Sequence, residues 1–132
     1  MKDFRLLLER RDKFFFEPLE VGNFKLSIQY NDIVKCDYTT DDIMDAESVE
    51  LAIMSKDNTE VTEISRYDEI TSFNRYDELL SFADYSVRLV YPDLIFCYVP
   101  IDLIQDLYEH LINYNIKLIN YHNDNEGILK RL

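Results

Sequence analysis

The chain has 132 residues, the size of a single domain, and 47% of them are hydrophobic, which is enough to bury a core. It contains only two glycines, which excludes the glycine-rich phosphate cradles of dinucleotide-binding folds and P-loops. Its formal net charge of −12 argues against binding to nucleic acid or to an anionic membrane, because both attract basic proteins.

Targeting and redox signals predict a cytoplasmic protein. The apolar run at residues 6–8 is too short for a signal peptide. The longest uncharged apolar stretch, residues 94–101, is far below the roughly 18 residues that a membrane span needs. Cys36 and Cys97 lie in apolar segments, where we expect two buried thiols in a reducing compartment; a disulfide or a catalytic thiol is the alternative.

The N-terminal third predicts a helix followed by two strands. Apolar residues at near-helical spacing indicate a helix over 3–15 that ends before Pro18. Residues 24–30 alternate between apolar and polar, which is the period of a half-buried strand. After a turn, residues 34–38 continue this pattern as a second strand.

The register of this hairpin follows from its apolar residues. A two-residue loop would place Ile28 opposite Lys35, whereas a shift of one residue places Ile28 opposite Cys36 and Leu26 opposite Tyr38. Because the shifted register matches apolar with apolar side chains, we expect a loop of three or five residues.

The central part of the chain predicts more strands, separated by turns at 56–59 and at Pro92-Asp93. Residues 94–99 are apolar on both faces, which is typical of a central strand. The expected strands are 49–53, 61–64 (the weakest), 87–91 and 94–99.

An amphipathic helix is predicted after Pro100, with an expected stop at Asn115, a last strand at 117–121 and a polar tail at 122–132. Its apolar stripe consists of Ile101, Ile104, Leu107, Tyr108, Leu111 and Ile112. Together these elements predict an α+β fold in a single domain, residues 1–132. Its largely antiparallel sheet has five to six strands, with an N-terminal helix, a short middle helix and the amphipathic C-terminal helix.

The middle of the chain contains one internal repeat. Residues 66–73 (RYDEITSF) are followed nine positions later by residues 75–82 (RYDELLSF). Nine residues turn a helix by about 900°, so two copies on one helix would face opposite directions. We therefore expect only the second copy to be helical, capped by Asn74, with Asp77 and Glu78 in its first turn. The aromatic and aliphatic residues of the repeat either pack in the core or form a paired Tyr-Asp-Glu surface for a basic partner.

The acidic charge is confined to the middle of the chain. Residues 36–109 hold 18 Asp and Glu against four Lys and Arg, whereas each flanking segment has a net charge of +1. This charge is either a solvated surface or a field for a basic partner, with interspersed tyrosines as anchors. The second interpretation assigns partner binding to Asp37, Asp41, Asp42, Asp45, Glu47, Glu50, Asp57, Glu60, Glu63, Tyr67, Asp68, Glu69, Tyr76, Asp77 and Glu78.

This composition resembles a group of small inhibitors. The acidic segment 37–84, the scarcity of glycine and an abundance of Ile, Asn and Tyr typical of AT-rich genomes are similar to anti-CRISPR and DNA-mimicking anti-restriction proteins of phages and mobile elements. The segment covers about a third of the chain and contains no diagnostic motif. The resemblance implies a protein of the host-cell cytoplasm whose carboxylates occupy the phosphate-binding surface of a nuclease or another nucleic-acid-binding protein.

No residue pattern predicts a catalytic, metal or cofactor site. Residues 41–47 lack the spacing and the glycine of a calcium loop, and His110 and His122 match no zinc motif. Asp106 and His110 are expected to form a minor surface pair. The alternatives to an acidic protein-binding inhibitor are an immunity protein that neutralises a toxin, a small metal-dependent enzyme that uses carboxylates, and a purely structural domain. The oligomeric state is left open.

Overall fold

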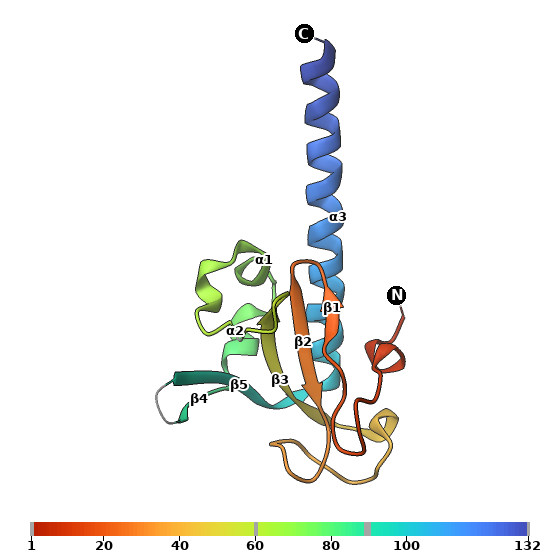
Figure 1. Cartoon of the computed structure of the whole chain (residues 1–132), viewed down its shortest axis with the longest axis vertical. Coiled ribbons are helices and arrows are strands. Elements are labelled where there is room, and N and C mark those ends of the chain that lie inside the picture. Colours follow the sequence, from red (N-terminus) through yellow and green to blue (C-terminus); the bar gives the residue numbers. More distant parts are fainter. Residues whose placement is uncertain (1, 60, 89–90, 132) are drawn as a thin grey trace.

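The computed structural model describes residues 2–59, 61–88 and 91–131, with side chains described outside 85–93 and 118–131. Five antiparallel strands form one sheet in the order β1-β2-β3-β5-β4 (Figure 1). The strands are β1 (Leu19–Val21), β2 (Phe24–Gln29), β3 (Ser48–Ser55), β4 (Ala83–Arg88) and β5 (Tyr91–Pro100). The helices are η1 (Phe4–Leu7), η2 (Ile43–Asp45), η3 (Ile64–Arg66), α1 (Asp68–Thr71), α2 (Tyr76–Leu80) and α3 (Ile101–Arg131). The predicted α+β class is confirmed.

The main core lies between one face of the sheet and the N-terminal part of α3 (Figure 1). Leu26 and Ile28 of β2 and Leu51 of β3 lie on this side, because alternate residues of a strand share a face. Phe96 of β5 and Leu107 of α3 join the same buried cluster. The other side of the sheet, called the outer face below, is not covered by α3 (Figure 1).

The amphipathic helix predicted after Pro100 is confirmed, but it continues to Arg131. The expected stop at Asn115 and the strand at 117–121 are therefore wrong, and the tail predicted from residue 122 is helical as far as Arg131. A left-handed residue often ends a helix, and among the described residues only Gly22, Asn58 and Tyr98 adopt positive φ. Beyond its contact with the β1–β2 turn, α3 extends past the sheet (Figure 1).

The N-terminal helix over 3–15 is wrong, since only the four residues of η1 are helical. The chain then turns at Asp12, whose Oδ1 accepts hydrogen bonds from the backbone N–H groups of Phe14 and Phe15, both at 2.8 Å. Such side-chain bonds compete with helical hydrogen bonding. The chain reverses here, and Arg10 forms an isolated bridge with Phe16.

The predicted hairpin of 24–30 with 34–38 is half correct. Residues 24–29 form β2, but both edges of β2 are taken by β1 and β3, so the second segment has no edge to join. Ile28 lies opposite Leu51 and not opposite Cys36. Residues 31–36 instead form a turn, in which Asn31 Oδ1 accepts the N–H groups of Ile33 at 2.8 Å and Val34 at 3.0 Å.

The later strands agree in part with the sequence. Residues 49–53 lie in β3, and 94–99 lie in β5, which occupies the expected interior position between β3 and β4. The turn at Pro92-Asp93 is wrong, because both residues belong to β5 and Pro92 pairs with Val87 of β4. The strand at 61–64 is also wrong: Val61 N–H donates to the Ile53 carbonyl at 2.9 Å, and η3 follows.

Both copies of the repeat contain a short helix, α1 in the first and α2 in the second. The helix in the second copy, with Asp77 and Glu78 in its first turn, is confirmed. The expectation that only the second copy is helical is wrong, because α1 lies in the first copy. The expected cap at Asn74 is also wrong, since Arg75 occupies the N-cap position. Ile70, Phe73 and Leu79 of the repeat are buried in the core. These apolar residues of the repeat are therefore structural.

The pairing of β3 with β5 contains a bulge. Val49 lies opposite Val99 and Leu51 opposite Phe96, so Glu50 of β3 faces two residues of β5, Cys97 and Tyr98. Tyr98 has a φ of 54°, in the left-handed region. Both cysteines are free; Cys36 is buried as expected, whereas Cys97 is partly exposed at the bulge.

No helix in the described part of the chain combines the length and the apolarity needed to cross a membrane.

Candidate functional site

The strongest candidate site is the acidic loop, which we define as residues 37–47 between β2 and β3. No Lys or Arg occurs from residue 36 to residue 55, so the loop has no positive charge of its own. Its five carboxylates are exposed, and none lies within ion-pair distance of a basic side chain that the structure describes. They belong to Asp37, Asp41, Asp42, Asp45 and Glu47.

The N-terminal part of the acidic loop is hydrogen-bonded to Tyr30, which follows β2, and to Ser48, the first residue of β3. The hydroxyl of the buried Tyr30 accepts the N–H groups of Thr39 at 3.3 Å and Thr40 at 3.4 Å. Asp37 N–H donates to Ser48 Oγ at 2.8 Å, and the Ser48 hydroxyl donates to Asp37 Oδ2 at 3.0 Å. The backbone that carries the carboxylates is therefore held in place without a partner.

The centre of the acidic loop is anchored by its apolar residues. Ile43 and Ala46 are buried in the core cluster. The carboxylate of Asp42 accepts the N–H of Met44 at 2.9 Å, which caps η2. The apolar side chains therefore point inward, and the acidic residues between them face solvent.

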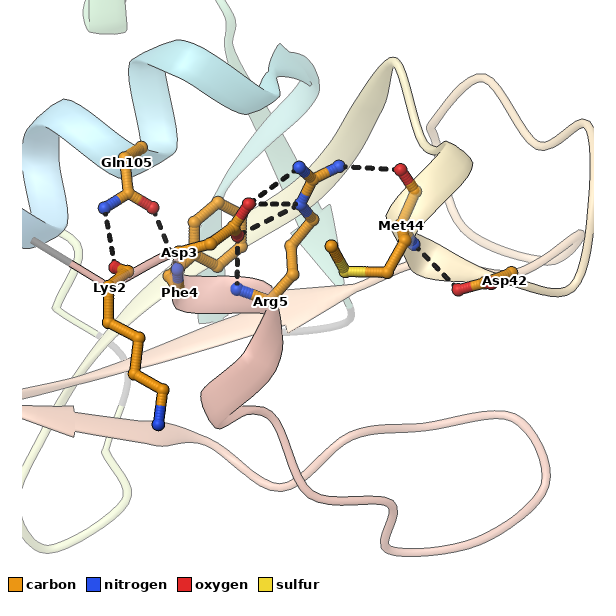
Figure 2. A network of polar contacts seen from close by, with 7 residues as sticks. All are labelled: Lys2, Asp3, Phe4, Arg5, Asp42, Met44 and Gln105. Carbon is orange, nitrogen blue, oxygen red and sulfur yellow. Dashed lines mark hydrogen bonds and ion pairs between the residues drawn. The ribbon is translucent and has the colours of Figure 1, made fainter.

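A bracing contact joins the N-terminal segment to the acidic loop (Figure 2). Arg5 Nη1 donates to the carbonyl of Met44 at 3.0 Å, and its other nitrogens bond to Asp3, which holds the pKa of Asp3 below its ordinary value. Gln105 of α3 secures the same segment: its Oε1 accepts Phe4 N–H at 2.8 Å, and its Nε2 donates to the Lys2 carbonyl at 3.0 Å. Arg5 thus supports the loop through a backbone carbonyl and leaves the loop carboxylates unpaired.

Tyr38 is the aromatic residue within the acidic loop. Its hydroxyl donates to Asp41 Oδ1, and this hydrogen bond raises the pKa of Tyr38 to about 12. Its ring lies 5.1 Å from that of Tyr30, centroid to centroid, and the side chain is partly exposed. Tyr38 is therefore a neutral, fixed aromatic side chain among the loop carboxylates.

The second acidic stretch lies elsewhere on the molecule. Glu47 precedes β3 and Asp57 follows it, so about 25 Å of strand separates the two stretches, at about 3.3 Å per residue. Glu60, which belongs to the second stretch in sequence, lies outside the described residues. The second stretch comprises Asp57, Glu63, Tyr67, Asp68, Glu69, Tyr76, Asp77 and Glu78. The predicted binding residues thus do not share one end of the sheet.

Part of the second stretch is neutralised by arginines. Arg75 bonds Glu78 at 2.7 Å, Asp106 at 2.6 Å and Asp102 at 3.1 Å, which links α2 to α3. The bonds to Arg75 hold the pKa of Glu78 below its ordinary value. Arg66 pairs with Glu63 in the same way. The carboxylates bonded to Arg75 hold α2 and α3 together and are less available to a partner.

Several of the remaining predicted residues have structural contacts. Glu50 lies in β3, where its Oε2 accepts Lys35 N–H at 2.9 Å. Glu69 Oε1 accepts a hydrogen bond from Asn23 at 2.9 Å. Tyr76 packs against the core, whereas Tyr67 is more exposed.

Two further expectations concern a pair of Asp106 with His110 and the binding of metal ions. The expected pair of Asp106 with His110 is not what the structure shows: Asp106 bonds Arg75, and His110 Nε2 lies 2.8 Å from the Glu69 carbonyl and 3.2 Å from Ser72 Oγ. Within the described residues, no three His, Cys, Asp or Glu side chains are placed to hold a metal ion.

Sequence reasoning missed the residues that hold the acidic loop and those that neutralise the second stretch. For Arg75 a signal existed, because Arg and Glu three positions apart on a helix form ion pairs. For Arg5 and Gln105 none existed, since their contacts lie 39 and 101 positions away in sequence. Comparisons of the chain with known protein families, curated proteins and solved structures gave no match.

Proposed function

We propose that the protein is an acidic inhibitor whose acidic loop occupies a basic, nucleic-acid-binding surface of a partner protein. The partner is a nuclease of the CRISPR or restriction type, or another nucleic-acid-binding protein. The observation that supports this proposal is the acidic loop: five exposed carboxylates without a described ion pair, on a backbone fixed by hydrogen bonds.

The physical argument has two parts. A fixed backbone lowers the entropy that binding must otherwise remove, so the loop is prepared for a partner. Unpaired carboxylates attract a basic surface over a distance and accelerate association, as phosphates do. Tyr38, exposed among them, adds the type of side chain that dominates many interfaces.

The test uses the whole protein as bait in lysates of phage-infected and of toxin-producing cells, with bound proteins identified by mass spectrometry. The association rate with the purified partner is then measured at increasing NaCl and with competing duplex DNA. We expect the rate to fall steeply with salt and the DNA to compete. A captured partner whose binding is insensitive to both would exclude charge mimicry.

A matched pair of variants locates the interface. The loop variant Asp41→Asn, Asp45→Asn, Glu47→Gln should slow association about tenfold or more. The control Glu9→Gln, Glu17→Gln, Glu20→Gln makes the same change in net charge at exposed positions outside the loop and should slow it less than about twofold. If the control slows association as much as the loop variant, the acidic loop is not the interface.

A further inference from the structure

The outer face of the sheet carries a pocket of about 520 Å³ beside the acidic loop. Its floor consists of Gln29 of β2, Glu50 of β3, Asp84 of β4 and Ile95 of β5. These residues come from four neighbouring strands, since Gln29 pairs with Glu50 and Asp84 with Ile95 across the ladders. The floor therefore spans two neighbouring rows on one face of the sheet, with Gln29 and Glu50 in one row and Asp84 and Ile95 in the next.

One wall of the pocket is the 31–36 turn that leads into the acidic loop, and this wall is fastened to the sheet. Lys35 N–H donates to Glu50 Oε2 at 2.9 Å, and Tyr98 N–H donates to the Lys35 carbonyl at 3.0 Å. The second bond comes from the bulge, where Tyr98 adopts its left-handed conformation. The bulge thus holds the wall over the floor, and the pocket is formed before any ligand binds.

The pocket combines aliphatic walls with carboxylates. Ile33, 67% exposed, and Val34 line its mouth, and Ile95 lies on the floor. Glu50 and Asp84 outnumber the one cation, Lys35. In a protein with a net charge of −12, this excess favours a cationic ligand over an anion.

Lys35 leaves room for such a ligand. Its Nζ lies 2.6 Å from Asp84 Oδ2, but the two side chains are 58% and 45% exposed. An ion pair this open to solvent contributes little and exchanges readily, so a second cation competes for Asp84. An aliphatic stem that ends in a cation fits both the walls and the carboxylates.

We propose that this pocket binds an arginine side chain of the basic partner, with the stem along Ile33 and Ile95 and the guanidinium against Glu50 and Asp84. Arginine is favoured over lysine because its planar guanidinium is weakly hydrated and pairs with carboxylates through two hydrogen bonds. The proposal rests on the proposed function, because it names a side chain of the protein that the acidic loop attracts. Because the 31–36 turn continues directly into the acidic loop, we expect the same partner to contact both.

The test uses N-acetyl-arginine amide as the probe and the full chain with ¹³C-labelled isoleucine methyl groups. We expect saturable NMR shifts at Ile33 and Ile95. N-acetyl-citrulline amide, which has nearly the same shape without the charge, should bind about tenfold or more weakly. Glu50→Gln with Asp84→Asn should weaken arginine binding to a similar degree, while Asp41→Asn, Asp45→Asn, Glu47→Gln should leave it within about twofold.

The outcomes separate this proposal from the proposed function. Equal binding of arginine and citrulline on the unaltered protein, or shifts confined to the acidic loop, would overturn the arginine pocket even if the double variant failed to fold. Either result leaves the salt-dependent capture of a partner by the loop standing. Conversely, a loop that captures no basic partner removes the proposed function, while the probe still reports whether the pocket binds arginine.

Discussion

The pKa of Tyr38 reports on its hydrogen bond to a carboxylate of the acidic loop. Its neutral hydroxyl donates to Asp41, so ionisation breaks a hydrogen bond and creates a second negative charge beside the carboxylate. The pKa is raised from an ordinary value of 10 to about 12. The contribution of this bond to stability is therefore complete below pH 10 and is lost as the pH rises through about 12.

We expect Asp41→Asn to return the pKa of Tyr38 towards its ordinary value. The measurement is an NMR titration of the ring Cζ signal of Tyr38 in both proteins. Tyr67, which is also exposed but lies outside the acidic loop, provides a second tyrosine signal in the same spectra. An unchanged Tyr38 titration in the variant would mean that the hydrogen bond to Asp41 is not formed in solution.

Truncation of a buried leucine and of an exposed leucine shows how much core packing contributes to stability. Leu107 of α3 is fully buried, so Leu107→Ala leaves a cavity and should lower the free energy of unfolding by about 2–5 kcal/mol. Leu6 is the matched control, because it is exposed and Leu6→Ala should change the free energy by less than about 0.5 kcal/mol. Urea denaturation of both variants provides the comparison. Equal losses would place Leu107 outside the core.

Tyr98 is a residue in a conformation that suits glycine. A left-handed backbone costs a residue with a Cβ roughly 1–2 kcal/mol, and glycine avoids this cost. Comparing Tyr98→Gly with Tyr98→Ala removes the side chain from both and isolates the backbone. We expect the glycine variant to unfold at a higher urea concentration than the alanine variant. Its free energy of unfolding should be larger by up to about 1 kcal/mol. The reverse order would show that the bulge relaxes to negative φ in solution.

Among the elements, the N-terminal segment depends on one side chain of α3. Gln105 bonds the backbone of both Lys2 and Phe4, so Gln105→Ala should speed hydrogen exchange of the Phe4 and Leu6 amides by about tenfold while β2 and β3 stay protected. Glu109→Ala, one turn further along α3, is the control and should leave these amides unchanged. Exchange that increases throughout the sheet would mean that Gln105 stabilises the whole core instead.

The elements that could be predicted from the sequence are those whose side chains meet the core at a regular period. The alternation at 24–29 and 49–53, the apolar run at 94–99 and the stripe beginning at Ile101 all correspond to β2, β3, β5 and α3. The failures lie where side chains bond the local backbone. Asp12 and Asn31 each accept two N–H groups and divert the chain from the expected helix and strand.

The charge of the candidate site could be predicted from the sequence, but the arrangement of its residues in space could not. The excess of carboxylates at 37–47 is visible in the composition, and the structure leaves them exposed. Their separation from the second stretch depends on β3 lying between them, and the pocket depends on four strands that are distant in sequence. Strand order is set by long-range packing, which a local pattern does not contain.

For the molecule as a whole, the net charge of −12 makes stability depend on salt. Repulsion among unpaired carboxylates opposes folding and is screened by ions, so raising NaCl from about 20 to 500 mM should raise the Tm by several degrees. The loop variant Asp41→Asn, Asp45→Asn, Glu47→Gln should have an equal or higher Tm at low salt and a smaller response. A Tm that falls with salt would show that ion pairs such as those of Arg75 outweigh the repulsion.

The acidic loop and the far end of α3 lie at opposite ends of the molecule (Figure 1). This arrangement determines how the protein is best tethered to a sensor surface. Coupling through amines is not selective among the lysines, and attachment at Lys13, which borders the same small hollow as Asp41, would turn the carboxylates towards the matrix. A single attachment on the last turns of α3 uses the helix as a spacer and directs the loop carboxylates outward, where a partner arrives from solution.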